Sequence, residues 1–67
     1  SMFFGKSHPI IAEDIRNIGL VFNKQGKLED AKKCYERALM ILEKRLGKDH
    51  PNAVLVRNNL KSLQENN

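Results

Sequence analysis

Apolar side chains recur near the start of the chain at intervals of four, three and four residues. These side chains are Ile11, Ile15, Ile18 and Phe22. Such spacing places them on one face of an α-helix. Pro9 suits the first turn, since its missing N–H would have no intrahelical acceptor there. The pattern predicts a helix over residues 9–23 with one apolar stripe along it.

A second amphipathic pattern begins after a short turn. Gly26 can adopt the left-handed conformation that ends a helix. Small and apolar residues then recur at Leu28, Ala31, Tyr35, Ala38 and Leu42, with Leu39, Ile41 and Leu46 beside them. Acidic residues open this segment and basic residues end it, which complements the helix dipole. A second helix over residues 28–46 is expected.

A third and weaker pattern follows Pro51. Its apolar residues are Val54, Leu60 and Leu63. Arg57 and Gln64 occupy the positions that correspond to Ile15 and Phe22 in the first helix. The expected fold class is therefore all-α, an antiparallel helical hairpin followed by a third helix.

The chain repeats its own loop sequence. The segment from Gly5 to Pro9 returns forty-two positions later, from Gly47 to Pro51. This offset lies within the range of roughly 20 to 50 residues that is typical of solenoid repeats. We expect four parts: residues 1–2 as the remnant of a purification tag, 3–7 as the end of a preceding repeat, 8–49 as one complete unit, and 50–67 as the first helix of the next.

Small residues predict how the first two helices pack. Gly19, Ala31 and Ala38 occupy positions at which a bulky side chain would hold the helices apart. Tyr35 and Phe22 are expected to fill the space beside them. A leucine in place of Gly19 should therefore disrupt the contact.

Composition narrows the class of protein. At 67 residues the chain holds one small domain. Its net charge of +4 favours acidic partners weakly and, being scattered, does not argue for nucleic acid. No run of apolar residues is long enough to span a membrane. A single cysteine, Cys34, excludes an internal disulfide and favours a reducing, cytoplasmic location.

The pattern of small and large residues resembles that of the tetratricopeptide repeat (TPR) family. It is carried by Ile15, Ile18, Gly19, Phe22, Gly26, Leu28, Ala31, Tyr35 and Ala38. The forty-two-residue spacing, Asn17, and the segments 25–27, 35–39 and 46–51 resemble the subtype found in kinesin light chains and nephrocystin-like proteins. The resemblance extends from Phe4 to about Leu63 and implies a TPR-type α-solenoid fragment of about one and a half repeats.

The chain departs from the family pattern at several positions. Glu43 stands where a proline commonly closes a repeat. Arg57, Lys61 and Gln64 stand where the second copy would carry apolar or small residues. The second copy is therefore degenerate or terminal, and a terminal helix must present a polar outer face to water.

The resemblance implies a non-enzymatic protein–protein interaction module that holds a partner peptide or helix in a concave groove, with no cofactor. By matched position, the groove residues are Glu13, Arg16, Asn17, Leu20, Asn23 and Lys24 from the first repeat, and Leu55, Asn58, Asn59 and Ser62 from the second. The amides of Asn17 and Asn59 are the best candidates, because they can pair with any peptide backbone. Arg16 could bind an acidic side chain or simply be solvated.

A clamp for a terminal carboxylate is not favoured, since Glu13 and Leu55 replace the lysine that such a clamp uses. A second hypothesis is architectural: the segment would form a homo-oligomer through apolar helix faces that lack a neighbouring repeat. His8, His50 and Cys34 lack the close spacing of metal ligands, so structural use is favoured. No nucleophile paired with a base is visible, which argues against an enzyme. A DNA-reading helix-turn-helix would leave the internal repeat unexplained.

Overall fold

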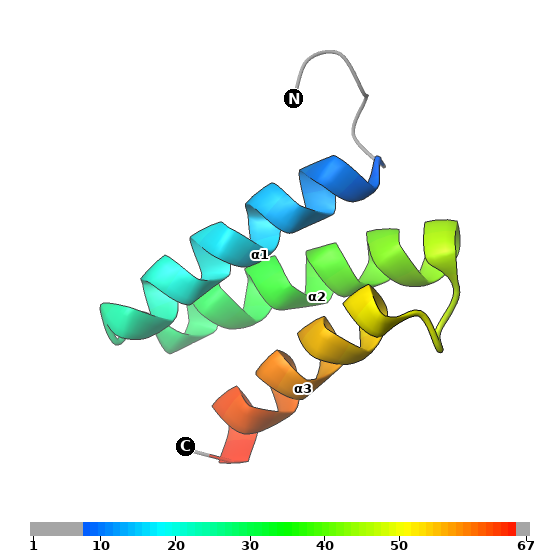
Figure 1. The fold of residues 1–67 in the computed structure, drawn as a ribbon. Coiled ribbons are helices and arrows are strands. Elements are labelled where there is room, and N and C mark those ends of the chain that lie inside the picture. Colours follow the sequence, from blue (N-terminus) through cyan, green and yellow to red (C-terminus); the bar gives the residue numbers. More distant parts are fainter. Residues whose placement is uncertain (1–7, 66–67) are drawn as a thin grey trace.

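The computed structural model describes residues 8–65 and contains three α-helices within that range: α1 (Pro9–Lys24), α2 (Leu28–Leu46) and α3 (Pro51–Glu65). Helices α1 and α2 form an antiparallel hairpin, and α3 packs on the other side of α2 (Figure 1). The expected all-α class, a helical hairpin plus a third helix, is confirmed. The tag remnant and the end of a preceding repeat, expected in residues 1–7, lie outside the described residues, and the division into repeat units stays a prediction.

Two histidines begin two of the helices in the same way. The N–H of Ile10 donates to Nδ1 of His8, and the N–H of Asn52 donates to Nδ1 of His50, both at 3.1 Å. Each bond satisfies a backbone donor that the first helical turn leaves without an acceptor, worth about 1 kcal/mol when a side chain supplies it. This geometry supports the structural interpretation of the histidines. Within residues 8–65, no group of three or more His, Cys, Asp or Glu side chains could hold a metal ion.

The turn between α1 and α2 is closed by a glycine. Gly26 has a φ of +79° and donates its N–H to the carbonyl of Asn23 at 3.0 Å. The N–H of Lys27 donates to the carbonyl of Phe22 at 2.9 Å. Together these bonds satisfy carbonyls at the end of α1, and the positive φ explains why glycine occupies the position.

The core lies where α2 meets the other two helices. Its buried apolar residues are Ala12, Ala31, Tyr35, Ala38, Ile41, Leu42, Ala53, Val56 and Leu63. Tyr35 and Val56 are the largest of these that are fully covered. Because α2 contributes the greatest share of the core, its position sets the placement of α1 and α3.

Gly19 marks the closest approach of α1 to α2. A Cβ added to it would lie 2.7 Å from Cε1 of Tyr35 and 3.1 Å from Cβ of Cys34. No real Cβ tolerates the first of these distances, so even alanine would force the ring or the helix to move. The expectation that this glycine permits close helix packing is therefore confirmed.

One member of the predicted stripe on α1 does not face the core. Ile18 is 51% exposed, whereas Ala12 and Gly19, outside that stripe, are buried against α2. Helix α1 has two apolar sides, and α2 covers only one of them. Ile10 at 45% and Val21 at 54% are exposed as well. Ile10, Ile18 and Val21 are called the open α1 face below.

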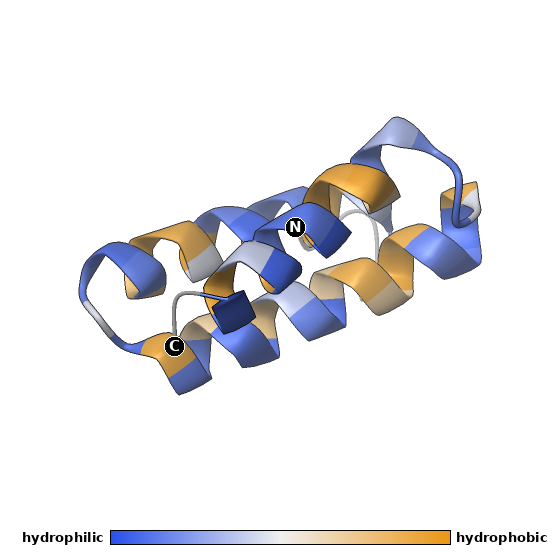
Figure 2. Ribbon diagram, turned by 90° about the horizontal axis from the view of Figure 1, so that it is seen from below, coloured by the Kyte–Doolittle hydropathy of each residue, from blue (hydrophilic) through white to orange (hydrophobic). Residues whose placement is uncertain are grey.

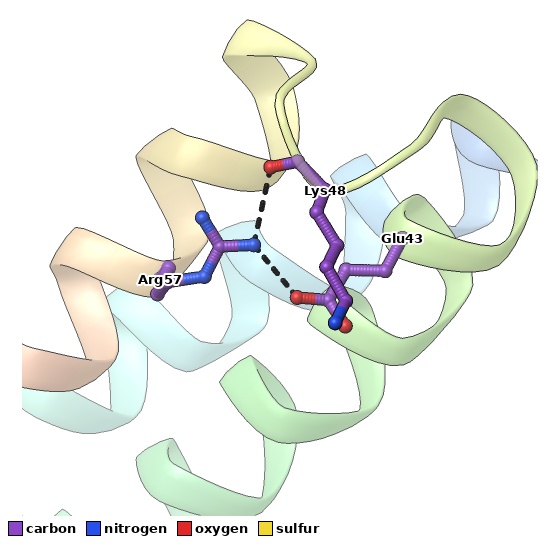
Figure 3. A network of polar contacts seen from close by, with 3 residues as sticks. All are labelled: Glu43, Lys48 and Arg57. Carbon is purple, nitrogen blue, oxygen red and sulfur yellow. Dashed lines mark hydrogen bonds and ion pairs between the residues drawn. The ribbon is translucent and has the colours of Figure 1, made fainter.

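An ion pair joins α3 to α2 and to the loop between them (Figure 3). Nη2 of Arg57 lies 2.7 Å from Oε2 of Glu43 and also donates to the carbonyl of Lys48 at 3.2 Å. Arg57 and Glu43 are two of the positions at which the chain departs from the family pattern. In the structure, these two side chains form an ion pair with each other.

We expect this ion pair to contribute little to stability. The side chains of Arg57 and Glu43 are 41% and 30% exposed, so solvent screens the attraction, and double replacement should reveal a coupling of only about 0.5 kcal/mol. Urea unfolding of Arg57→Ala, Glu43→Ala and the double variant measures it. The coupling should shrink at high salt. A coupling of zero at low salt would show that the pair does not hold α3 in place.

Candidate functional site

The residues predicted to bind a partner come from α1 and α3, the two helices that pack on α2. Figure 2 shows that hydrophilic and hydrophobic segments alternate along the helices. The set on α1 is Glu13, Arg16, Asn17, Leu20, Asn23 and Lys24, and the set on α3 is Leu55, Asn58, Asn59 and Ser62. We call these ten residues the candidate binding face. The part of the chain that the structure describes contains no enclosed pocket.

Most of the candidate binding face is exposed. Arg16, Leu20 and Asn59 are half-buried, and the other seven side chains are exposed to solvent. Leu20 packs against the edge of the core. The exposed residues could therefore contact a partner directly, whereas the three half-buried ones support them from below.

Two polar atoms of this face are buried and have no hydrogen-bond partner among residues 8–65. They are Nε of Arg16, a donor on α1, and Oδ1 of Asn59, an acceptor on α3. The same arginine has its Nη2 3.2 Å from Oε1 of Glu13, one turn away. An unsatisfied buried polar group costs about 1–3 kcal/mol, so these two side chains gain from any rearrangement that supplies a partner.

The phenol of Tyr35 connects α2 to the candidate binding face. Tyr35 is only 1% exposed and hydrogen-bonds with Asn23. Burial raises the pKa of its hydroxyl above the ordinary value of 10.0, while the bond with Asn23 and the nearby charge of Arg16 act in the opposite direction. The phenol therefore stays neutral near pH 7, as a buried tyrosine must if it is not to carry an uncompensated charge.

Cys34 does not have the properties of a nucleophile. It is a free, half-buried thiol on α2. Burial raises its pKa above the ordinary 9.0, Asp30 raises it further, and Arg37 acts against both. Reactive cysteines need a lowered pKa, because the thiolate is the attacking species. This environment favours a thiol that contributes to packing.

Asn17 and Asn59 match in sequence position but not in surroundings. Asn17 is exposed on α1, whereas Asn59 is half-buried on α3. The difference arises because α2 packs against one side of α3, whereas the corresponding side of α1 is exposed. Sequence reasoning treated the two amides alike, and it also missed the bond between Asn23 and Tyr35, for which spacing offers no signal.

None of the helices within residues 8–65 combines the length and apolar character that crossing a bilayer requires. A family model described as Tetratricopeptide repeat matches residues 4–65. No curated protein and no solved structure matched the chain. The matched range spans all three helices, and the glycine-mediated packing of α1 on α2 agrees with the small-residue pattern from which the resemblance was first inferred. The chain therefore belongs to the tetratricopeptide repeat family, whose members generally mediate protein–protein interactions.

Proposed function

We propose that the chain is a non-enzymatic interaction module that binds a peptide or helix of a partner protein on the candidate binding face. The observation that carries this proposal is that seven of the ten side chains of the candidate binding face, on α1 and α3, are exposed to solvent. Both helices begin at a histidine cap, so the side chains project from ordered elements. Ordered supports reduce the entropy lost on binding.

The chemistry of this face suits a peptide main chain. The exposed amides of Asn17 and Asn58 can each donate and accept, as a peptide bond requires. Leu55, which is 46% exposed, offers an apolar contact beside them. Arg16 is already paired with Glu13, so an acidic side chain of the partner would have to compete with that carboxylate.

We further propose that the chain belongs to the subtype that resembles kinesin light chains and nephrocystin-like proteins. The forty-two-residue offset supports this, as does the recurrence of one capping geometry at His8 and His50. A cytoplasmic location is proposed from the single free Cys34. The proposed partner is a protein, with no role for nucleic acid, membrane or cofactor.

The groove hypothesis is tested with peptides selected from a displayed random library against the full chain. A selected peptide should shift the backbone NMR signals of the candidate binding face. Asn17→Ala should weaken its binding by about tenfold, the loss expected for one or two hydrogen bonds, with unchanged helical circular dichroism. Met40→Ala is the matched control, because Met40 is 72% exposed on α2 and lies outside this face.

Two results would contradict the proposal. One is a selected peptide that shifts the signals of α2 around Met40 and leaves those of α1 and α3 unchanged. The other is equal affinity of the natural chain and Asn17→Ala for every peptide selected. Either result would move binding away from the candidate binding face.

A second candidate function is self-association, favoured by the open α1 face. Ile10, Ile18 and Val21 are about half exposed although all three are strongly apolar. We expect the chain to form oligomers at high micromolar concentration and Ile18→Lys to abolish them, while Met40→Lys leaves them intact. Sedimentation equilibrium makes the measurement. A single 7.7 kDa species for the natural chain would count against this function.

A further inference from the structure

The internal repeat shows which side of α3 is used for packing. α3 buries Ala53, Val56 and Leu63 in the core, and Leu60 packs beside them. The residues forty-two positions earlier on α1 are Ile11, Asp14, Ile18 and Val21. Three of these four are exposed. The side by which α3 packs on α2 is therefore the side that α1 leaves open.

We next compare the side of α1 that packs on α2 with the corresponding side of α3. That side of α1 carries Ala12, Ile15, Gly19 and Phe22. The residues forty-two positions later are Val54, Arg57, Lys61 and Gln64, which we call the outer α3 face. If α3 were the first helix of a further hairpin, the second helix of that hairpin would have to pack on this face, as α2 packs on α1.

Lys61 prevents such packing by its size. At the matched position, a single Cβ on Gly19 would already lie 2.7 Å from a ring carbon of Tyr35. Beyond its Cβ, a lysine has three more carbons and a charged nitrogen, so no helix can approach α3 as closely as α2 approaches α1. Lys61 is exposed, as its charge requires.

The other members of the outer α3 face add to the exclusion. Gln64 is exposed and replaces the ring of Phe22, so a covering helix would bury an amide in place of an apolar contact. Arg57 is bound to Glu43 and to the carbonyl of Lys48. A helix laid over this ion pair would remove water from both charges, which costs several kcal/mol per ion.

We propose that α3 closes the helical stack. Its outer face excludes the second helix of a further repeat, whichever chain that helix belongs to. This proposal goes beyond peptide binding and would stand if the candidate binding face proved inactive.

The test extends the full chain with a second copy of residues 26–46 placed after Asn67, which keeps the forty-two-residue offset. Natural α3 should leave the added segment undocked, with amide hydrogen exchange as fast as in an unfolded peptide and an unchanged melting midpoint. A rewritten chain carries Val54→Ala, Arg57→Ile, Lys61→Gly and Gln64→Phe. In it, the added amides should exchange at least about tenfold more slowly, as in a packed helix.

The extended natural chain and the extended rewritten chain each give a result that supports or contradicts the proposal. Protection of the added segment on natural α3 would overturn the proposal, and this arm does not depend on the rewritten chain folding. An extended chain with Lys61→Gly alone is the second variant and should show intermediate protection. If neither the rewritten chain nor Lys61→Gly protects the added segment while exchange in α1 and α2 remains slow, the outer α3 face is not what excludes a helix, and the proposal is wrong.

Discussion

Gly19→Leu is expected to remove much of the free energy of unfolding of the chain. The Cβ alone would lie 2.7 and 2.9 Å from two ring carbons of Tyr35, and that ring is 1% exposed, so it has no free space to enter. The two helices would have to separate. Overpacking by even a few carbons costs about 1–3 kcal/mol, and a core of this size seldom supplies more than about 3–5 kcal/mol in total. Far-ultraviolet circular dichroism with urea titration measures the loss.

Two further variants separate packing from helix propensity. Gly19→Ala gains up to about 1 kcal/mol of propensity, yet the clash should outweigh this gain and leave the variant less stable than the natural chain. Val21→Leu, on the open α1 face, should change the free energy of unfolding by less than about 0.5 kcal/mol. A natural urea midpoint for Gly19→Leu would show that α1 and α2 do not meet at this residue.

Tyr35→Ala is expected to lower the free energy of unfolding by about 3–5 kcal/mol, the range for removing a buried aromatic ring. Tyr35 is buried between the helices and bonded to Asn23, so the variant loses core volume and a cross-helix bond together. Tyr35→Phe keeps the ring and loses only the hydroxyl, which should cost about 0.5–1.5 kcal/mol. Thermal and urea unfolding of the natural chain and of Tyr35→Phe give the smaller value, and the loss of helical circular dichroism reports on Tyr35→Ala, which should be largely unfolded.

The control for Tyr35→Ala is Met40→Ala on the same helix. Met40 is 72% exposed, and its truncation should change stability by no more than about 0.5 kcal/mol. Equal losses at the two positions would mean that α2 presents a different side to its neighbours. A loss for Tyr35→Phe as large as that for Tyr35→Ala would mean that the hydroxyl dominates over the packing of the ring.

Local signals made the helices predictable from the sequence. Pro9 and Pro51 each stand at the first position of a helix, and Gly26 takes the positive φ expected after α1. Such features act within one or two turns, so a single sequence is sufficient to recognise them. The close contact at Gly19 was also predictable, because a glycine inside a helix usually has a packing reason.

The sequence could not show which apolar side of α1 would be covered. Ile18 and Gly19 are adjacent, and their directions differ by about 100° on a helix with 3.6 residues per turn. Ile18 belongs to the predicted apolar stripe and Gly19 does not, yet it is Gly19 that meets α2. The choice depends on the crossing of two helices, and periodicity within one of them contains no information about that crossing.

Contacts between polar side chains of different helices also depend on how the helices cross. Arg57 and Glu43 were each recognised as departures from a family pattern, but their contact arises from how α3 crosses α2. The candidate binding face was predicted by matched position, and seven of its ten side chains are exposed to solvent. Whether they bind a partner remains a proposal.

The most direct test of the account measures the contact between α1 and α2 in solution. Nuclear Overhauser effects between the α-protons of Gly19 and the ring protons of Tyr35 should be strong, since the glycine lies directly against that ring. The ring current should also move the signals of those α-protons away from their random-coil positions. Random-coil shifts for Gly19, together with no Overhauser effect to a solvent-exposed Tyr35, would contradict the repeat packing on which the proposed function rests.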